Sequence, residues 1–98
     1  MPLNLTCALF LERVNETFRI TAGAESLDLQ LTECSLINSP SGESQGRQPF
    51  SLVFRGPVSP VLAQRIYPLE NKALGELELF LVPIGPDKLG MRYEAVFN

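Results

Sequence analysis

The stretch that decides the fold reads Leu77-Glu78-Leu79-Phe80-Leu81-Val82, then a Pro/Gly segment through Gly85-Pro86-Asp87 and Gly90, and then Met91-Arg92-Tyr93-Glu94-Ala95-Val96-Phe97. Apolar residues recur at every second position in both runs, which is the period of a half-buried β-strand. The Pro and Gly residues between the runs are turn formers. The stretch therefore predicts a terminal β-hairpin, which needs further strands or a helix against its apolar face to be stable.

The two-residue period also assigns each side chain of this hairpin to a face. Residues opposite each other in a ladder share a face, so the inward set is predicted to be Leu77, Leu79, Leu81, Met91, Tyr93, Ala95 and Phe97. The outward set contains Glu76, Glu78, Arg92 and Glu94. A register that places Glu78 opposite Arg92 is favoured over one that places it opposite Glu94 by ~0.2–1 kcal/mol.

Three apolar residues fall on the outward face of the hairpin: Phe80, Val82 and Val96. A large apolar side chain on a wet face is an exception that needs a cover. The sequence offers two covers, the N-terminal helix or another protein chain.

Outside the hairpin, residues 4–14 predict a short helix of two to three turns. Asn4 is the expected cap, and Leu5, Ala8 and Leu9 lie on one face of the expected helix, with Phe10 and Val14 close by. An edge strand is the alternative for so short an apolar run. Residues 18–21 and 27–31 alternate with period two around Ala22-Gly23-Ala24, which predicts a first hairpin.

The middle of the chain contains a polar loop and two more strands. Residues 38–48 consist of turn formers and polar residues, which predicts a flexible, solvated loop. A strand from Phe50 to Phe54 is stopped by Gly56-Pro57, because proline cannot donate to a ladder. Residues 66–69 predict a short strand whose Pro68 suits only an edge or a bulge.

These elements predict one β-rich domain over residues 1–98. About six short strands with tight turns and one short N-terminal helix are typical of a mainly β fold, a small antiparallel barrel or roll, with a sandwich as a further possibility. A chain of 98 residues has room for a single core.

The charge balance argues against two classes of partner. Charged residues make up 19% of the chain, below the usual share of about 25%. The net charge is −3, and the basic residues are scattered singly, so no basic stripe is available for phosphates or anionic lipids. We expect no nucleic acid and no membrane surface among the partners. The start of the chain has no signal-peptide pattern, which predicts a cytoplasmic protein that an exported assembly could incorporate.

The sequence contains little that suggests catalysis. It has no histidine, and it lacks the phosphate-binding glycine motifs and calcium-loop patterns. Glu76, Glu78 and Glu94 share the outward face, but a solvated strand face with Arg92 as counter-charge explains them better than a metal site or a carboxylate dyad. Asp87 is expected to cap its own backbone in a turn. We expect no enzyme, no catalytic residues, no cofactor and no metal.

The two cysteines, Cys7 and Cys34, have 26 residues between them. This spacing matches neither a metal knuckle nor a redox CxxC motif. In a reducing compartment both would remain thiols, so we expect two buried or half-buried thiols rather than a disulfide.

Arg55-Gly56-Pro57 is the most distinctive local string, and it is a candidate interaction site. An arginine beside a Gly-Pro corner can bind a carboxylate or a partner's carbonyl with its planar fork. The alternative is an arginine that pairs across the sheet with a glutamate. Tyr67 and Tyr93 are expected to point inward with a polar tip, because no basic residues flank them as in an RNA-binding sheet.

Three runs carry a resemblance to a known family: Pro49 to Pro57, Leu77 to Asp87 and Met91 to Asn98, with Tyr67-Pro68-Leu69-Glu70 as a middle piece. They resemble a small bacterial domain family of unassigned function whose members show FSLxFRGP, LELFLVPxGPD and MRYEAVFN. Its members look like genomic neighbours of phage-tail-collar-type proteins. The resemblance implies a role in building or finishing a tail-like assembly, and it implies no catalytic residues.

The leading hypothesis is therefore a non-enzymatic assembly or adaptor protein that uses an exposed strand edge and the Phe80/Val82 patch to contact a second copy or a larger tail-like structure. The candidate interaction residues are Arg55, Gly56, Pro57, Phe80 and Val82. An alternative is a barrel that binds a small apolar ligand near Phe54 and Tyr93. A third hypothesis, an enzyme, would need Glu76, Glu78 or Glu94 to converge in a cleft.

Overall fold

The computed structural model describes residues 6–22, 25–37, 49–59 and 61–97. One helix, α1 (Cys7–Leu11), precedes six strands. The strands are β1 (Thr17–Ala22), β2 (Glu25–Leu36), β3 (Phe50–Gly56), β4 (Arg65–Asn71), β5 (Gly75–Asp87) and β6 (Gly90–Phe97). No helix in these ranges is long and apolar enough to cross a membrane.

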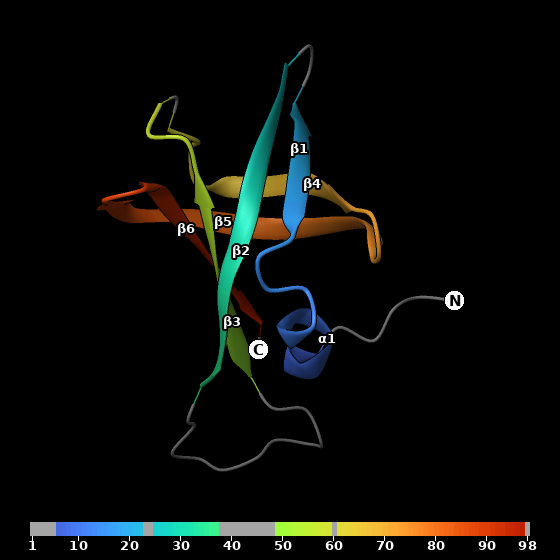
Figure 1. Ribbon diagram of the computed structural model, residues 1–98. Helices are drawn as coiled ribbons and strands as arrows, with labels where there is room; N and C mark the ends of the chain where they lie inside the picture. The colour runs from blue at the N-terminus through green and yellow to red at the C-terminus, as the bar shows by residue number, and fades with distance from the viewer. Residues whose placement is uncertain (1–5, 23–24, 38–48, 60, 98) are drawn as a thin grey trace.

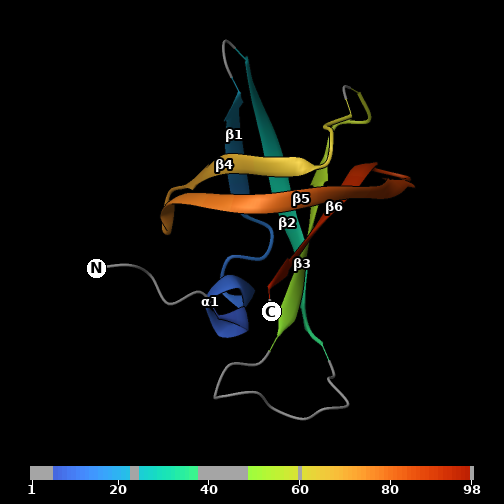
Figure 2. The same ribbon diagram turned by 180° about the vertical axis from the view of Figure 1, so that it is seen from behind.

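The six strands form a closed antiparallel barrel in the order β1-β2-β3-β6-β5-β4, which confirms the predicted fold class. In Figure 1, β1 and β2 cross β4 and β5 at a steep angle, and Figure 2 shows β4 and β5 side by side from behind. Closure gives each strand two neighbours in the sheet, although each half of β5 pairs with only one of its two neighbours.

The long strand β5 changes partners halfway along its length. Residues 75–81 pair with β4, and residues 82–87 pair with β6. The predicted turn is present but shorter than expected: Gly85 and Pro86 belong to β5, and the chain reverses between Asp87 and Gly90. The register shifts between Pro83 and Gly85, and Gly85 has a φ of 109°. The shift leaves Ile84 as an extra residue on β5 between two residues that pair with consecutive residues of β6. Such a β-bulge bends a strand and increases its twist.

The predicted register of the terminal hairpin is also wrong. Glu78 lies opposite Pro68 of β4, whereas Arg92 lies opposite Gly85 and Glu94 opposite Val82. A weak charge preference between side chains cannot set this register, because barrel closure decides which half of β5 each neighbour meets.

The assignment of side chains to faces is confirmed. The inward residues Leu77, Leu79, Leu81, Met91, Tyr93 and Ala95 are buried, and Phe97 packs against the core. Phe80 and Val96 are about half exposed. This prediction succeeds because alternation is a property of each strand alone and does not depend on the partner strand.

The helix α1 is shorter than predicted and buries a different residue. It begins after Thr6, whose Oγ1 accepts a hydrogen bond from the Leu9 amide at 3.2 Å, and it ends at Leu11. The predicted cap Asn4 and the apolar Leu5 lie outside the described residues. Phe10 is the buried residue of α1, while Ala8 is exposed. One turn of helix has no continuous apolar face, so a single large ring anchors it.

The remaining strand predictions agree closely with the structure. The first hairpin is present, although β2 extends beyond the predicted Leu31, and β3 ends at Gly56 as predicted. The strand β4 is longer than residues 66–69. Its ladder with β1 contains the pairs Arg19–Glu70 and Ile20–Leu69 and stops at Pro68, which lacks the backbone donor that a further pair requires. The predicted loop over residues 38–48 lies outside the described residues.

Candidate interaction surface

An apolar patch lies on the outside of the barrel, on β4 and β5. We call Ile66, Phe80 and Val82 the outer patch. Ile66 and Phe80 are a directly opposed cross-strand pair, with 60% and 48% of their surfaces exposed. Val82 follows Phe80 on the same face of β5 and is partly buried. If a partner covered Ile66 and Phe80, each side chain would stabilise the complex by roughly 1 kcal/mol.

The helix does not cover the outer patch. Among the described elements, α1 makes its main contacts with β2, and its Phe10 points into the core. The sequence offered two covers for Phe80, and the prediction that the N-terminal helix covers it is wrong. Val96, the third apolar residue on the wet face, stands apart on β6, opposite Ser51 of β3, and is 50% exposed.

The acidic residues around the outer patch do not converge on one site, because each lies opposite a different residue in the barrel. Glu76 lies opposite Glu70, Glu78 opposite Pro68, and Glu94 opposite both Val82 and Val53. Arg92, the expected counter-charge, donates from Nε to the backbone oxygen of Gly85 at 3.2 Å. In the described part of the chain, no three His, Cys, Asp or Glu residues are grouped so that they could hold a metal ion.

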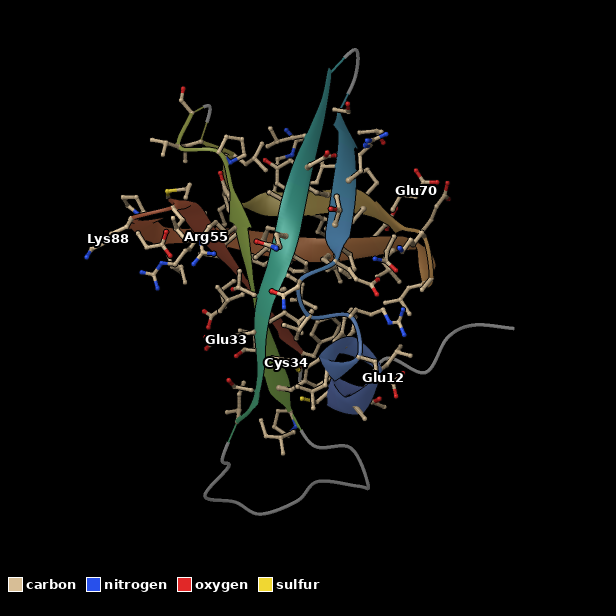
Figure 3. The ribbon with its side chains drawn as sticks, viewed as in Figure 1. Glu12, Glu33, Cys34, Arg55, Glu70 and Lys88 are labelled. Atoms are coloured by element: carbon tan, nitrogen blue, oxygen red, sulfur yellow. The ribbon has the colours of Figure 1, made fainter. Side chains whose placement is uncertain are left out.

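Arg55 is paired with Asp87 in a two-pronged ion pair. Nη2 of Arg55 lies 2.6 Å from Oδ2 of Asp87, and Nε lies within 3.2 Å of both carboxylate oxygens. The prediction that Arg55 pairs with a glutamate is wrong, because the turn at the end of β5 brings Asp87 beside β3. Figure 3 shows Arg55 near the end of the β5–β6 hairpin, where Lys88 lies.

Asp87 also closes the turn between β5 and β6. Its Oδ1 accepts hydrogen bonds from the amides of Leu89 at 2.9 Å and Gly90 at 3.0 Å, which confirms the predicted backbone cap. The hydrogen bonds from Arg55 and then from Leu89 lower the pKa of Asp87 to about 2. A salt bridge and a turn thus share one carboxylate.

In the same string, the backbone of Gly56 lies in close contact with Gly90 of β6. A Cβ at Gly90 would lie 2.2 Å from the backbone oxygen of Gly56, and a Cβ at Gly56 would lie 2.5 Å from Cδ2 of Leu29. Gly56 is buried and Pro57 is exposed. Of the three candidate residues in this string, the structure therefore gives Arg55 and Gly56 packing partners within the chain and leaves Pro57 on the surface.

The Arg55–Asp87 pair predicts a specific dependence of stability on pH. An aspartate with a pKa near 3.9 in the unfolded chain and about 2 in the folded chain stabilises the fold at any pH above about 4. That contribution is lost as pH falls through the interval between the two values. We expect Asp87→Asn to lower Tm at neutral pH, and we expect the difference from the wild type to shrink toward pH 2.

The matched control for this measurement is Asp28→Asn. Asp28 accepts from Nε of Arg19 at 3.0 Å in a pair whose side chains are both more than half exposed, and this hydrogen bond raises the pKa of Arg19. Solvent screens such a pair, so its removal should change Tm little. Equal Tm curves for Asp87→Asn and Asp28→Asn across the acid range would contradict the assignment.

A polar depression, which the sequence did not predict, lies between β1 and β4. It has a volume of about 520 Å³ and is lined by Asn15, Glu16, Thr17, Arg19, Glu70 and Lys72. Charges of both signs meet here, and Glu16 is already engaged with Arg13 at 3.0 Å and with Asn71 at 3.2 Å. The residues come from two stretches of the chain, 15–19 and 70–72, that are far apart in the sequence, so no local pattern could have identified them.

Side chains fill the inside of the barrel around Phe54 and Tyr93, the place predicted for an apolar ligand. Phe54 and Tyr93 are fully buried, and the Phe54 ring packs edge-on against Phe18 with centroids 5.2 Å apart. The Tyr93 hydroxyl accepts from the Leu62 amide at 2.8 Å, and the Tyr67 hydroxyl donates to the Ala63 oxygen at 2.7 Å. Both tyrosines are thus inward aromatics with a polar tip, as predicted, and they fasten the β3–β4 connection.

These features define a small closed antiparallel β-barrel with a packed interior and an apolar patch on its outer face. A family model described as a domain of unknown function (DUF6916) matches residues 5–97, so the chain belongs to this family. The match agrees with the resemblance of the sequence to a small domain family of unassigned function. The chain matches no curated protein and no solved structure.

Proposed function

We propose that this protein is a non-enzymatic assembly or adaptor protein that binds a partner subunit through the outer patch. The observation that carries the proposal is the exposed cross-strand pair of Ile66 and Phe80, which no described element of the chain covers. Aromatic side chains are common anchors of protein interfaces. The resemblance, whose family members look like genomic neighbours of phage-tail-collar-type proteins, supports a setting in a tail-like or other multi-subunit bacterial structure. The proposed site of synthesis is the cytoplasm.

The charges around the outer patch favour a different protein over a second copy. Glu78 precedes Phe80 on the outward face of β5, Glu76 and Glu70 form a cross-strand pair beyond it on β5 and β4, and Glu94 lies opposite Val82. Two copies joined patch to patch would bring these acids together, which is unfavourable. The partner that fits offers an apolar anchor surrounded by lysine and arginine. Its binding should weaken as salt increases, because exposed charge pairs are screened.

The variant Phe80→Glu tests this surface. It is expected to weaken partner binding by about 2 kcal/mol or more, roughly 30-fold in Kd, because it removes an anchor and adds a charge. The matched control is Val58→Glu, which adds the same charge at a residue that is 63% exposed beyond the end of β3. Captured partners from the native host would be identified, purified and titrated against all three chains by calorimetry.

Two outcomes would contradict the proposal. If Phe80→Glu and Val58→Glu bind the purified partner as tightly as the wild type does, the outer patch is not the interface. If light scattering shows a wild-type dimer that Phe80→Glu dissociates, a second copy occupies the patch and the charge argument is wrong.

A further inference from the structure

Cys7 and Cys34 lie much closer together than their separation in the sequence suggests. Cys7 is the first residue of α1 and Cys34 lies near the end of β2, yet their Sγ atoms are 2.6 Å apart. Figure 3 shows Cys34 on β2 beside α1. Both are free and half-buried, as the sequence predicted, and Sγ of Cys34 also contacts the backbone oxygen of Cys7 at 3.6 Å.

The two thiols need little movement to become bonded. A disulfide bond is about 2.05 Å long, so the sulfur atoms would approach each other by only about half an ångström. The elements that carry them are already in contact, because α1 packs against β2 and Phe10 fixes α1 in the core. We propose that Cys7 and Cys34 form an intramolecular disulfide in the folded chain, and that this bond fastens α1 to β2.

The oxidant is a low-molecular-weight disulfide, represented by oxidised glutathione. Burial, followed by the hydrogen bond with Cys7, raises the pKa of Cys34 to about 12. A thiolate is the attacking species, and we give the first attack to Cys7 because burial disfavours the thiolate of Cys34. This attack forms a mixed disulfide between Cys7 and one glutathione and releases the other glutathione as a thiolate.

The second step closes the protein disulfide. Cys34 gives up its proton, attacks the Cys7 sulfur and displaces the second glutathione. In total the cysteine pair loses two electrons and two protons, and these reduce one oxidised glutathione to two thiols.

The bond would matter because α1 is weak on its own. It has five residues, far fewer than an isolated helix needs to be stable in water. A disulfide between residues 7 and 34 also restricts the unfolded chain, which stabilises the folded state. The oxidised protein should therefore melt at a higher temperature than the reduced protein, with α1 held on the barrel.

The experiment equilibrates the full chain with glutathione buffers of increasing oxidised fraction, followed by alkylation of free thiols and mass spectrometry. The wild type is expected to lose the mass of two hydrogen atoms, to lose both alkylation sites together and to gain Tm. Cys7→Ser and Cys34→Ser leave one thiol each, so they should form at most a mixed disulfide with glutathione. The same titration in concentrated urea is expected to need a more oxidising buffer.

Three results would overturn the proposal. One is a wild type that keeps two alkylatable thiols at a glutathione ratio that oxidises the chain in urea. Another is a disulfide that joins two chains rather than Cys7 and Cys34 of one chain. The third is an oxidised wild type with the same Tm as the reduced form, because that bond would not fasten α1 to the fold.

Discussion

Replacing Phe10 with alanine is expected to lower the free energy of unfolding by about 3–5 kcal/mol, the usual cost of removing a buried phenylalanine. Phe10 is fully buried, and its ring centroid lies 5.7 Å from Phe97, 6.0 Å from Phe50 and 6.5 Å from Phe18. Domains of this size have a total stability of about 5–15 kcal/mol, so the loss is a large part of the whole.

The reason for so large an effect is that Phe10 seals one end of the barrel. The rings of Phe50 and Phe97 stack with centroids 4.5 Å apart at the ends of β3 and β6, and Phe10 packs against both. Removing Phe10 would leave a cavity beside this stack and release α1, which has no other buried residue. The loss should appear in urea unfolding followed by circular dichroism.

The matched control is Leu11→Ala, one residue further along α1. Leu11 is 53% exposed, so its truncation should cost less than about 1 kcal/mol. Similar losses for Phe10→Ala and Leu11→Ala would show that α1 contributes no core residue. Phe10→Ala should also weaken formation of the disulfide between Cys7 and Cys34, because it removes the anchor that holds Cys7 beside β2.

Replacing Asn71 with leucine is expected to cost about 2–6 kcal/mol, because it removes the four hydrogen bonds of this side chain, each worth about 0.5–1.5 kcal/mol. Asn71 is 2% exposed and is the buried polar residue of the described core. Its Oδ1 accepts from the amides of Ala73 and Leu74 at 2.9 Å each, and its Nδ2 donates to the Thr17 oxygen at 3.1 Å. One side chain thus holds the β4–β5 turn and ties it to the start of β1.

A second substitution separates the two ends of the amide. Asn71→Asp keeps an acceptor for Ala73 and Leu74 but places a carboxylate beside the Thr17 oxygen and Glu16, where repulsion replaces two hydrogen bonds. We expect it to destabilise the fold and to become less harmful when acid protonates it. The exposed neighbour Lys72→Leu is the control. If urea unfolding gave Asn71→Leu the stability of Lys72→Leu, the network around Asn71 would not hold the turn.

Several features of the site were beyond the reach of sequence patterns. The sequence predicts an interaction site at Arg55-Gly56-Pro57, but the partner of Arg55 is Asp87, 32 residues further along the chain. The polar depression between β1 and β4 likewise combines residues 15–19 with Glu70 and Lys72. Contacts of this kind depend on which strands become neighbours, and no local period encodes that choice.

What the sequence determined by itself is the face that each strand residue occupies. The placement of Leu79 and Tyr93 inside and Phe80 outside follows from the two-residue period of an extended backbone, whichever strand lies next to it. The tertiary structure alone decided that β5 pairs first with β4 and then with β6, that Phe10 closes the barrel, and that Cys7 meets Cys34. The physical reason is that closing a barrel fixes strand neighbours through long-range pairing, whereas side-chain alternation is fixed by the geometry of consecutive residues.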